Sequence, residues 1–429
     1  MKTLLVALGL LLLVQQCVPV TPTGSTSTNR LWLDNRSYEP TIKSVMLYPN
    51  GAYANPSQKF LVPAVLFLND GNKQLILEFD DLSEGNDYFF AKILHCNADW
   101  SRSNLRDLEF LSDYNEFPLN NWAYSSNTRE GYVHYTYNVP AVKIPGNYVL
   151  AIYRNNDINQ VVLTHRFMVV ENRVVVKANL ERPLSPGARN DAQRVTFTVD
   201  YNNLDATNPR TQFSVLVRQN RRWDVTRKPQ PSQIREGNSM LLYQPLDETL
   251  DFPGGNEFRW FETRNLNFPG QNVGNIKLAT DRVDAYILEE KSRGGLAYGQ
   301  IPDYNGGYIP RISGDIGITE GDYLHSHFLL NSDSLAGAIY VVGDFNNWRA
   351  NEESRMRYNG KGGYEADLLL KQGWYNYQYL YKGEPSNPWR LEGSHFATEN
   401  DYEIFVYYRP LGSIQDLLVG YTSFTANPR

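Results

Sequence analysis

The amino-acid sequence predicts an all-β protein that is built from several β-sandwich domains in tandem. Aromatic residues make up 13% of the chain, including 29 tyrosines, and together with Val and Thr they dominate the patterned segments. Such residues favour the half-buried surface of a pleated sheet. The 31 glycines and 23 prolines are spread along the chain as punctuation, which is typical of many short strands joined by turns.

Length and charge limit the kinds of partner that the protein can have. A chain of 429 residues is long enough for about two to four domains with separate cores. The formal net charge is −6, and the cationic residues form no basic stripe. The sequence therefore argues against nucleic acid as a partner, because phosphate binding needs clustered Lys and Arg.

The first 17 residues have the pattern of an export signal. Lys2 supplies a positive start, and the apolar run Leu4–Val14 is too short to span a membrane. The end of the signal, Leu13–Cys17, resembles the lipobox of bacterial lipoproteins, although Gln16 stands where a small residue normally precedes the cysteine. We therefore expect export from the cytoplasm, while lipidation of Cys17 stays open.

Residues 18–35 are expected to be a flexible tether, because a segment rich in Pro, Thr, Ser and Gly cannot bury a core. If Cys17 is removed or acylated, Cys96 is the single remaining cysteine. The sequence then predicts no disulfide, and packed sheets must stabilise the fold.

Residues 36–171 are predicted to form a first sandwich of the immunoglobulin type, because seven short strands alternate with turn signals. The turns are Asn50–Gly51, Asp70–Gly71 and Pro145–Gly146. The segment Asp99–Trp122 interrupts the pattern and is interpreted as a long loop with a binding role. The expected strands are Thr41–Tyr48, Lys59–Phe67, Gln74–Phe79, Tyr88–His95, Tyr132–Asn138, Asn147–Tyr153 and Leu163–Val170.

Residues 172–320 and 321–429 are predicted to form a second and a third sandwich. The segment Lys291–Gly307 is either a long hairpin tip or a mobile loop. The expected strands of the second unit are Val174–Ala178, Val195–Tyr201, Gln212–Gln219, Met240–Tyr243, Glu257–Thr263, Val273–Leu278 and Ala285–Leu288. Those of the third unit are Tyr323–Leu330, Ala338–Val342, Tyr364–Leu370, Tyr375–Tyr381 and Tyr402–Arg409.

The stretch His95–Trp100 places a histidine, a cysteine, a carboxylate and a tryptophan within six residues. A Cys–His pair suggests a nucleophile or a metal site. Adjacent residues on a strand point to opposite faces, however, so His95 and Cys96 are expected to lie apart, with Cys96 buried in a sheet. For the same reason Asp80 and Asp81 are expected to diverge, which speaks against paired acid–base catalysis.

Two further patterns have a structural and a functional interpretation. Four tyrosines alternate from Tyr375 to Tyr381 and share one face of a strand. A core face is the favoured interpretation, and a protein-binding surface is the alternative. His325 and His327 share a face at a spacing that can hold a metal, but no third ligand is adjacent, which favours hydrogen-bonded or solvated histidines.

The sequence contains no G-x-S-x-G elbow, no phosphate-binding loop, no H-E-x-x-H motif and no calcium loop. It therefore predicts a protein that is not an enzyme, with no catalytic residues, no cofactor and no bound metal.

The stretch Gly343–Trp348 resembles the glycogen-binding early-set domains of carbohydrate-active enzymes. The resemblance covers roughly the last quarter of the chain and implies an early-set sandwich for residues 321–429. Those domains stack sugar rings on tryptophans, and Trp348 stands where one such tryptophan can stand. Glu384 follows Gly383 where the second tryptophan is expected. Glycan binding through Trp348, by an exported lipoprotein, is therefore the alternative function.

Several blocks along the chain, in a fixed order, resemble the plug proteins of the type IX secretion system of Bacteroidetes. The resemblance covers nearly the whole mature chain. The blocks are Phe79–Leu82, His95–Trp100, Ser126–Thr128, His134–Tyr135, Pro145–Tyr148, Gly254–Arg259, Tyr340–Trp348, Thr398–Tyr402 and Val406–Arg409.

This resemblance implies a periplasmic protein, associated with the outer membrane, that binds the translocon β-barrel of that membrane. It would block the periplasmic mouth of the pore when no substrate passes. The resemblance brings no catalytic residues, and motifs alone do not assign the residues that contact the translocon. Membrane contact is expected only through the partner or through a lipid on Cys17.

Overall fold

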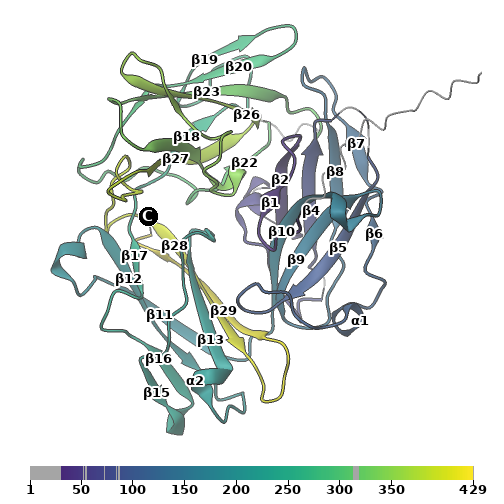
Figure 1. Ribbon diagram of the computed structural model, residues 1–429, viewed down its shortest axis with the longest axis vertical. Helices are drawn as coiled ribbons and strands as arrows, with labels where there is room; N and C mark the ends of the chain where they lie inside the picture. The colour runs from purple at the N-terminus through teal and green to yellow at the C-terminus, as the bar shows by residue number, and fades with distance from the viewer. Residues whose placement is uncertain are drawn as a thin grey trace, which may run out of the picture.

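The computed structural model describes residues 30–428, except residues 52, 54, 55, 72, 84, 86 and 313–317. The expected export signal at residues 1–17, with Cys17, and residues 18–29 of the expected tether lie outside the described residues. Strands are the main regular structure of the described chain, and they form six sheets. These sheets are grouped into three sandwiches (Figure 1), which confirms the predicted all-β fold of tandem β-sandwich domains.

The first sandwich encloses a core of alternating apolar side chains between two sheets. One sheet contains β1 (Arg36–Ser37), β3 (Val65–Phe67), β5 (Phe89–Cys96), β6 (Phe117–Pro118), β9 (Gly146–Arg154) and β10 (Val161–Val170). The other contains β2 (Ile42–Pro49), β4 (Leu75–Asp81), β7 (Trp122–Tyr124) and β8 (Val133–Asn138). A short helix, α1 (Asp107–Phe110), lies between β5 and β6 in the chain.

The predicted strand Lys59–Phe67 is wrong in its first part. Residues Pro56–Leu61 form a 3-10 turn, and only β3 is a strand. Pro63 has no backbone N–H to give to a strand ladder. The turn also buries the ring of Phe60, which is 4% exposed, so the apolar pattern reflects a packed turn.

Two distant parts of the chain form the second sandwich. Its first sheet contains β11 (Val175–Glu181), β12 (Ala192–Asp200), β15 (Gln233–Arg235), β16 (Met240–Tyr243) and β17 (Asp251–Pro253). Its second sheet contains β13 (Phe213–Gln219), β14 (Thr226–Arg227), β28 (Asn400–Tyr408) and β29 (Leu417–Ala426). The short helix α2 (Pro209–Gln212) leads directly into β13.

The third sandwich consists of the intervening strands. One sheet contains β18 (Arg259–Glu262), β22 (Tyr308–Ile309), β24 (Ala338–Val342) and β27 (Trp374–Lys382). The other contains β19 (Val273–Leu278), β20 (Val283–Ile287), β21 (Glu290–Lys291), β23 (Tyr323–Asn331), β25 (Arg357–Tyr358) and β26 (Gly363–Lys371). Residues 292–307 form an irregular loop between β21 and β22.

The sheets do not divide at residues 320 and 321, where the sequence predicts a boundary. Strand β28 pairs with β13 from Phe213↔Tyr408 to Gln219↔Tyr402, while β18 and β20 pair with β27 and β23 of the third sandwich. The third sandwich is thus inserted into the second. The hydrophobic core gives the physical reason, since Tyr402 and Val406 pack in the same cluster as Phe197 of β12.

Candidate interaction surface

The segment between β5 and β8 exposes several large apolar side chains on the first sandwich. Leu108 is 70% exposed, Tyr114 is 76% exposed, and Tyr124 is 56% exposed. Clusters of exposed apolar residues on a folded domain mark sites of interaction with other molecules. This segment coincides with the predicted long loop Asp99–Trp122, and it is the strongest candidate for a contact surface. We call it the aromatic segment, residues 99–124.

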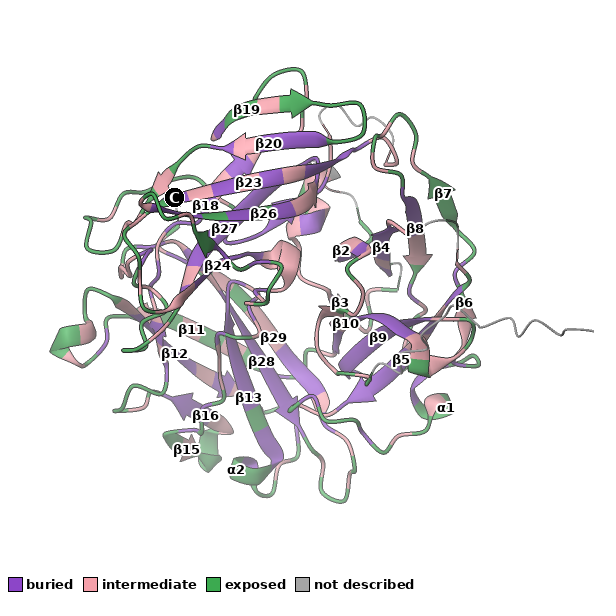
Figure 2. Ribbon diagram, turned by 45° about the horizontal axis from the view of Figure 1, so that its top comes forward, coloured by how far each residue is buried: buried purple, intermediate pink, exposed green. Residues whose placement is uncertain are grey.

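The aromatic segment ends in β7, which forms the edge of its sheet. All three residues of β7 are exposed, and the strand lies on the outer side of the first sandwich (Figure 2). Its register with β8 pairs Trp122 with Tyr135 and Tyr124 with Val133. The rings of Trp122 and Tyr124 pack edge to face, with their centroids 5.3 Å apart. Such rings supply much of the binding energy in protein interfaces.

The aromatic segment is held firmly on the sandwich although its tips are exposed. The Asn115 side chain accepts a hydrogen bond from Ile93 N at 2.9 Å and donates one to Ile93 O at 2.7 Å. Phe110 and Leu119 are 2% and 5% exposed and belong to the core of the first sandwich. A surface that is ordered before binding loses little conformational entropy when a partner docks.

His95 and Cys96 lie on opposite faces of β5, as the sequence predicts. His95 packs inside the first sandwich, with its ring centroid 5.1 Å from that of Tyr148. Cys96 is 0% exposed and packs on the other face. Gly146, predicted in a turn, begins β9, and a Cβ there would lie 2.6 Å from His95 Nε2. The sequence block therefore serves packing, and the two side chains form no Cys–His pair.

Replacing His95 by leucine is expected to flatten the pH dependence of stability in acid. Burial lowers the pKa of His95 to about 4, from an ordinary value of 6.5. Between these values the unfolded chain binds a proton that the folded chain does not, so the free energy of unfolding falls as the pH falls. Between neutral pH and pH 4 the protonation of His95 should lower the free energy of unfolding by about 3 kcal/mol, since one pKa unit is about 1.4 kcal/mol. The leucine variant should lack this decrease. Urea unfolding at neutral pH and at pH 4 measures it.

The matched control for this variant is Phe110→Leu, which alters the ring that His95 contacts at 5.9 Å but keeps the imidazole. It should keep the wild-type pH dependence. If the free energy of unfolding decreases equally between neutral pH and pH 4 in the wild type and in the leucine variant, His95 is not the group responsible.

The thiol of Cys96 is expected to resist alkylation in the native protein. Burial raises its pKa to about 12, and only the thiolate reacts. We expect iodoacetamide to label Cys96 at least about 100-fold more slowly in the folded protein than in concentrated urea. Mass spectrometry of the Cys96 peptide measures both rates, and comparable rates would show that the thiol is reactive.

Asp80 and Asp81 diverge from β4, as predicted, and each finds a different cation. Asp81 Oδ2 lies 3.2 Å from the guanidinium of Arg154 within the first sandwich. Asp80 points instead to the third sandwich, where its carboxylate lies 2.7 Å from Lys371 Nζ. The two carboxylates therefore do not form an acid–base pair.

Asp80 is the centre of a buried polar network between the first and third sandwiches. Besides Lys371, it contacts His134 Nδ1 at 2.7 Å and accepts a hydrogen bond from Tyr323 OH at 2.8 Å. Burial alone would raise the pKa of Asp80, but Lys371 and His134 outweigh burial and hold that pKa below its usual range. Burial lowers the pKa of Lys371, although Asp80 opposes this effect. The pair ties the two sandwiches together.

The seam between the first and second sandwiches is largely apolar. Trp100 of the first sandwich meets Trp223 of the second edge to face, with centroids 4.9 Å apart. The guanidinium of Arg166 lies over both rings, at 4.3 Å and 4.8 Å from their centroids. Cys96 and Leu418 pack in the same hydrophobic cluster. Burial of this apolar surface resists separation of the two sandwiches.

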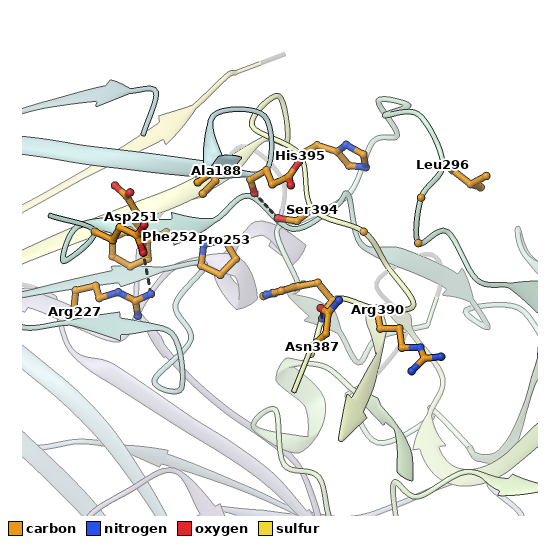
Figure 3. A pocket seen from close by; sticks show the side chains of 17 residues that line it. Ala188, Arg227, Asp251, Phe252, Pro253, Leu296, Asn387, Arg390, Ser394 and His395 are labelled. Atoms are coloured by element: carbon orange, nitrogen blue, oxygen red, sulfur yellow. Dashed lines mark hydrogen bonds between the residues drawn. The ribbon is translucent and has the colours of Figure 1, made fainter. Parts of the chain in front are cut away.

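A groove of about 710 Å³ lies between the second and third sandwiches (Figure 3). Arg227 and Asp251 come from the second sandwich, while Arg390 and His395 lie on the connection between β27 and β28. Within the groove the Arg227 guanidinium donates a hydrogen bond to the Asp251 carbonyl at 3.1 Å. Glu248 also lines the groove, so its mixed charges favour neither an anion nor a cation.

The tyrosine stripe from Tyr375 to Tyr381 is a core face, as the sequence predicts. Its four rings are at most 2% exposed and belong to the core of the third sandwich. The opposite side of β27 is buried as well. Asn376 Oδ1 accepts a hydrogen bond from Tyr304 N at 2.8 Å. The stripe is therefore not a binding surface.

His325 and His327 share one face of β23, and each meets a carboxylate. His325 Nδ1 lies 3.2 Å from Asp367, and His327 Nε2 lies 2.8 Å from Asp284. Among the described residues no group of three or more His, Cys, Asp or Glu side chains is arranged to hold a metal ion. The same part of the chain contains no helix of the length and apolarity needed to cross a membrane.

Trp348, the candidate glycan-binding residue, is 8% exposed. The Arg222 guanidinium lies 4.0 Å from the centroid of the indole, and the Phe258 ring lies at 5.4 Å. Gly306, with φ +87°, approaches so closely that a Cβ there would meet the indole at 2.6 Å. An indole covered in this way has no open face on which a sugar ring could stack, so its placement does not favour the glycan-binding alternative.

The sequence marks the loop that carries the aromatic segment but not the exposed rings within it. The signal is the triplet Trp122–Tyr124, in which two aromatic residues alternate as they do on one face of a strand. The burial of Lys371 is the other feature that sequence reasoning missed, because a lysine at the end of a strand is usually solvated.

The comparisons with known proteins support the resemblance seen in the sequence. The family model described as type 9 secretion system plug protein, 1st domain, matches residues 42–171, which is the first sandwich. A crystal structure of a hypothetical protein from Parabacteroides merdae ATCC 43184 is similar, with a TM-score of 0.84 and 29% sequence identity. The match covers 92% of this chain and 100% of that one. A search of curated proteins found no match.

The resemblance of residues 321–429 to early-set domains stays a prediction. The match to residues 42–171, by contrast, includes the sequence blocks that contain Asp80, His95 and His134. Residues 42–171 thus match the first domain of the type 9 secretion system plug proteins, and this match suggests a role in type 9 secretion.

Proposed function

We propose that this protein is a non-enzymatic plug that resides in the periplasm at the outer membrane. It binds the β-barrel of the type 9 translocon and closes the periplasmic end of the pore when no substrate passes. The observation that carries this proposal is the plug-protein domain at residues 42–171, packed against two further sandwiches.

The packing between the sandwiches suits a stopper, which must not deform under a gradient across the pore. The first and third sandwiches are joined by the enclosed pair of Asp80 and Lys371. The first and second are joined by an apolar seam around Trp100 and Trp223. Separating either seam exposes buried charge or apolar surface to water, and both costs favour a single rigid body.

The aromatic segment supplies the surface for the proposed contact with the translocon. Its rings are exposed, but Asn115 and Phe110 anchor the segment to the sandwich. Complementary packing of rigid aromatic side chains can hold a partner without any reaction. The titratable side chains marked by the sequence, His95, Cys96 and Asp80, serve packing and domain contacts, which supports a non-catalytic role.

Membrane contact is proposed to come through the translocon, or through a lipid on Cys17 if the mature chain begins there. Mass measurement of the mature amino terminus separates these two arrangements, because acylation adds the mass of the lipid to Cys17.

Affinity purification from detergent-solubilised outer membranes tests the proposed function. A tagged copy should recover a large outer-membrane β-barrel protein in near-equal amount, and deletion of the gene should raise the uptake of bulky antibiotics. An unrelated tagged periplasmic protein is the control for the purification. Recovery without a barrel partner, together with unchanged antibiotic uptake in the deletion strain, would overturn the proposal.

A further inference from the structure

A small cavity of about 70 Å³ lies where the three sandwiches meet. Each sandwich contributes part of the wall. The first contributes Val45, Met46, Leu47, Phe60, His165, Arg166 and Met168, the second contributes Arg218, Arg221 and Trp223, and the third contributes Tyr308, Asp344 and Asn347. The wall is therefore rich in guanidinium groups. None of its residues belongs to the aromatic segment.

Only one of the three arginines in the wall has a carboxylate partner among the described residues. Arg218 forms two hydrogen bonds to Glu403, at 2.7 Å and 2.9 Å. Arg166 donates from Nε to the Leu33 carbonyl at 2.8 Å. Arg221 donates to the Leu61 carbonyl at 2.6 Å. Carbonyl oxygens accept these hydrogen bonds but do not cancel the two positive charges.

The nearby carboxylates offset this charge only in part. Asp34 Oδ2 already forms ion pairs with the guanidiniums of Arg36, at 3.1 Å, and Arg349, at 2.9 Å. Asp344 lines the cavity, but no cation of the described chain lies within 4.0 Å of its carboxylate, and burial raises its pKa. In the wall, the guanidiniums of Arg166, Arg218 and Arg221 thus stand against the carboxylate of Asp344 and that of Glu403 on Arg218, which leaves one positive charge in excess.

A half-buried positive charge without a counter-ion loses part of its hydration, and Arg166 shows the effect. Burial, with a smaller contribution from the neighbouring Arg218, lowers the pKa of Arg166 to about 10, although Asp34 offsets part of the effect. An anion in the cavity would replace the lost hydration and return the guanidinium to its ordinary state. Guanidinium groups bind oxyanions with matched pairs of N–H donors.

We propose that this cavity binds one small inorganic oxyanion of the phosphate or sulfate kind, with Arg166 and Arg221 as its charged donors. The volume admits a single tetrahedral ion or a few waters and is too small for a nucleotide or a sugar. Because all three sandwiches line the cavity, the bound ion links them, and its binding stabilises their arrangement by mass action.

Isothermal titration of the full mature protein with inorganic phosphate, and separately with sulfate, tests the proposal. We expect one site per chain, and we expect Arg166→Gln and Arg221→Gln each to weaken binding at least about tenfold, the effect of losing one charged hydrogen bond. Arg355→Gln is the control, since Arg355 is exposed and pairs only with Glu352 in the described chain. Titration in chloride and in acetate buffers shows whether chloride competes for the site.

Absence of saturable binding by the wild-type protein to both ions would overturn the proposal, and so would equal affinity in the wild type and both cavity variants. If a cavity variant does not fold, the wild-type titration still decides. Binding to the protein should broaden the phosphorus resonance of phosphate, and excess sulfate should reverse the broadening. This measurement provides a second readout. All of these measurements use the isolated protein, so their outcome is independent of binding to the translocon.

Discussion

Replacing Lys371 by methionine is expected to lower the free energy of unfolding by about 3–5 kcal/mol. Lys371 Nζ lies 2.7 Å from Asp80 Oδ2, and both side chains are at most 2% exposed. The variant leaves a buried carboxylate without its ammonium partner, and among the described side chains His134 and Tyr323 remain as its hydrogen-bond partners. Urea unfolding followed by circular dichroism measures the change.

Lys361→Met is the matched control, because Lys361 is exposed in the turn before β26. It should change the free energy of unfolding by less than about 0.5 kcal/mol. Adding Asp80→Asn to Lys371→Met should recover part of the loss, since the unpaired charge is then removed. A loss below about 1 kcal/mol for Lys371→Met alone would mean that water reaches the pair and that the network does not hold the sandwiches.

Replacing Trp122 and Tyr124 together by alanine is expected to weaken binding to the translocon barrel at least about 30-fold, which corresponds to about 2 kcal/mol. The expectation depends on the proposed function. These rings are exposed and pack against each other at 5.3 Å, so the change removes contact area while the core of the first sandwich stays intact. Surface-plasmon measurements with purified barrel protein in detergent give the affinity.

Leu411→Ala is the control for this variant, since Leu411 is 85% exposed on the second sandwich, away from the aromatic segment. It should leave the affinity unchanged, and thermal unfolding should show that both variants are folded. If the double alanine variant binds as tightly as the wild type while Leu411→Ala binds more weakly, the contact lies on the second sandwich.

Much of the local structure could be predicted because a strand repeats its environment every second residue. Alternation places His95 and Cys96 on opposite faces, separates Asp80 from Asp81, and gathers the tyrosines of β27 on one core face, as the structure confirms. The prediction failed at Lys59–Phe67, where a packed 3-10 turn has the same apolar residues as a strand.

The candidate contact surface was predictable only in part. The polar, aromatic segment 99–124 stands out as an interruption between strands, but its composition does not say which rings are exposed. Phe110 is 2% exposed and Tyr114 is 76% exposed, although both are aromatic residues of the same segment. Their difference depends on the direction of the chain across the sandwich.

The sequence by itself determined the β-class of the protein, most of its strands and the buried face of each strand. Only the tertiary structure decided that β28 returns to β13 across an inserted sandwich, that Asp80 meets a lysine 291 residues away, and that several arginines surround one cavity. The physical reason is that a period of two reports that one face of a strand is buried, but it carries no information about which distant element covers that face.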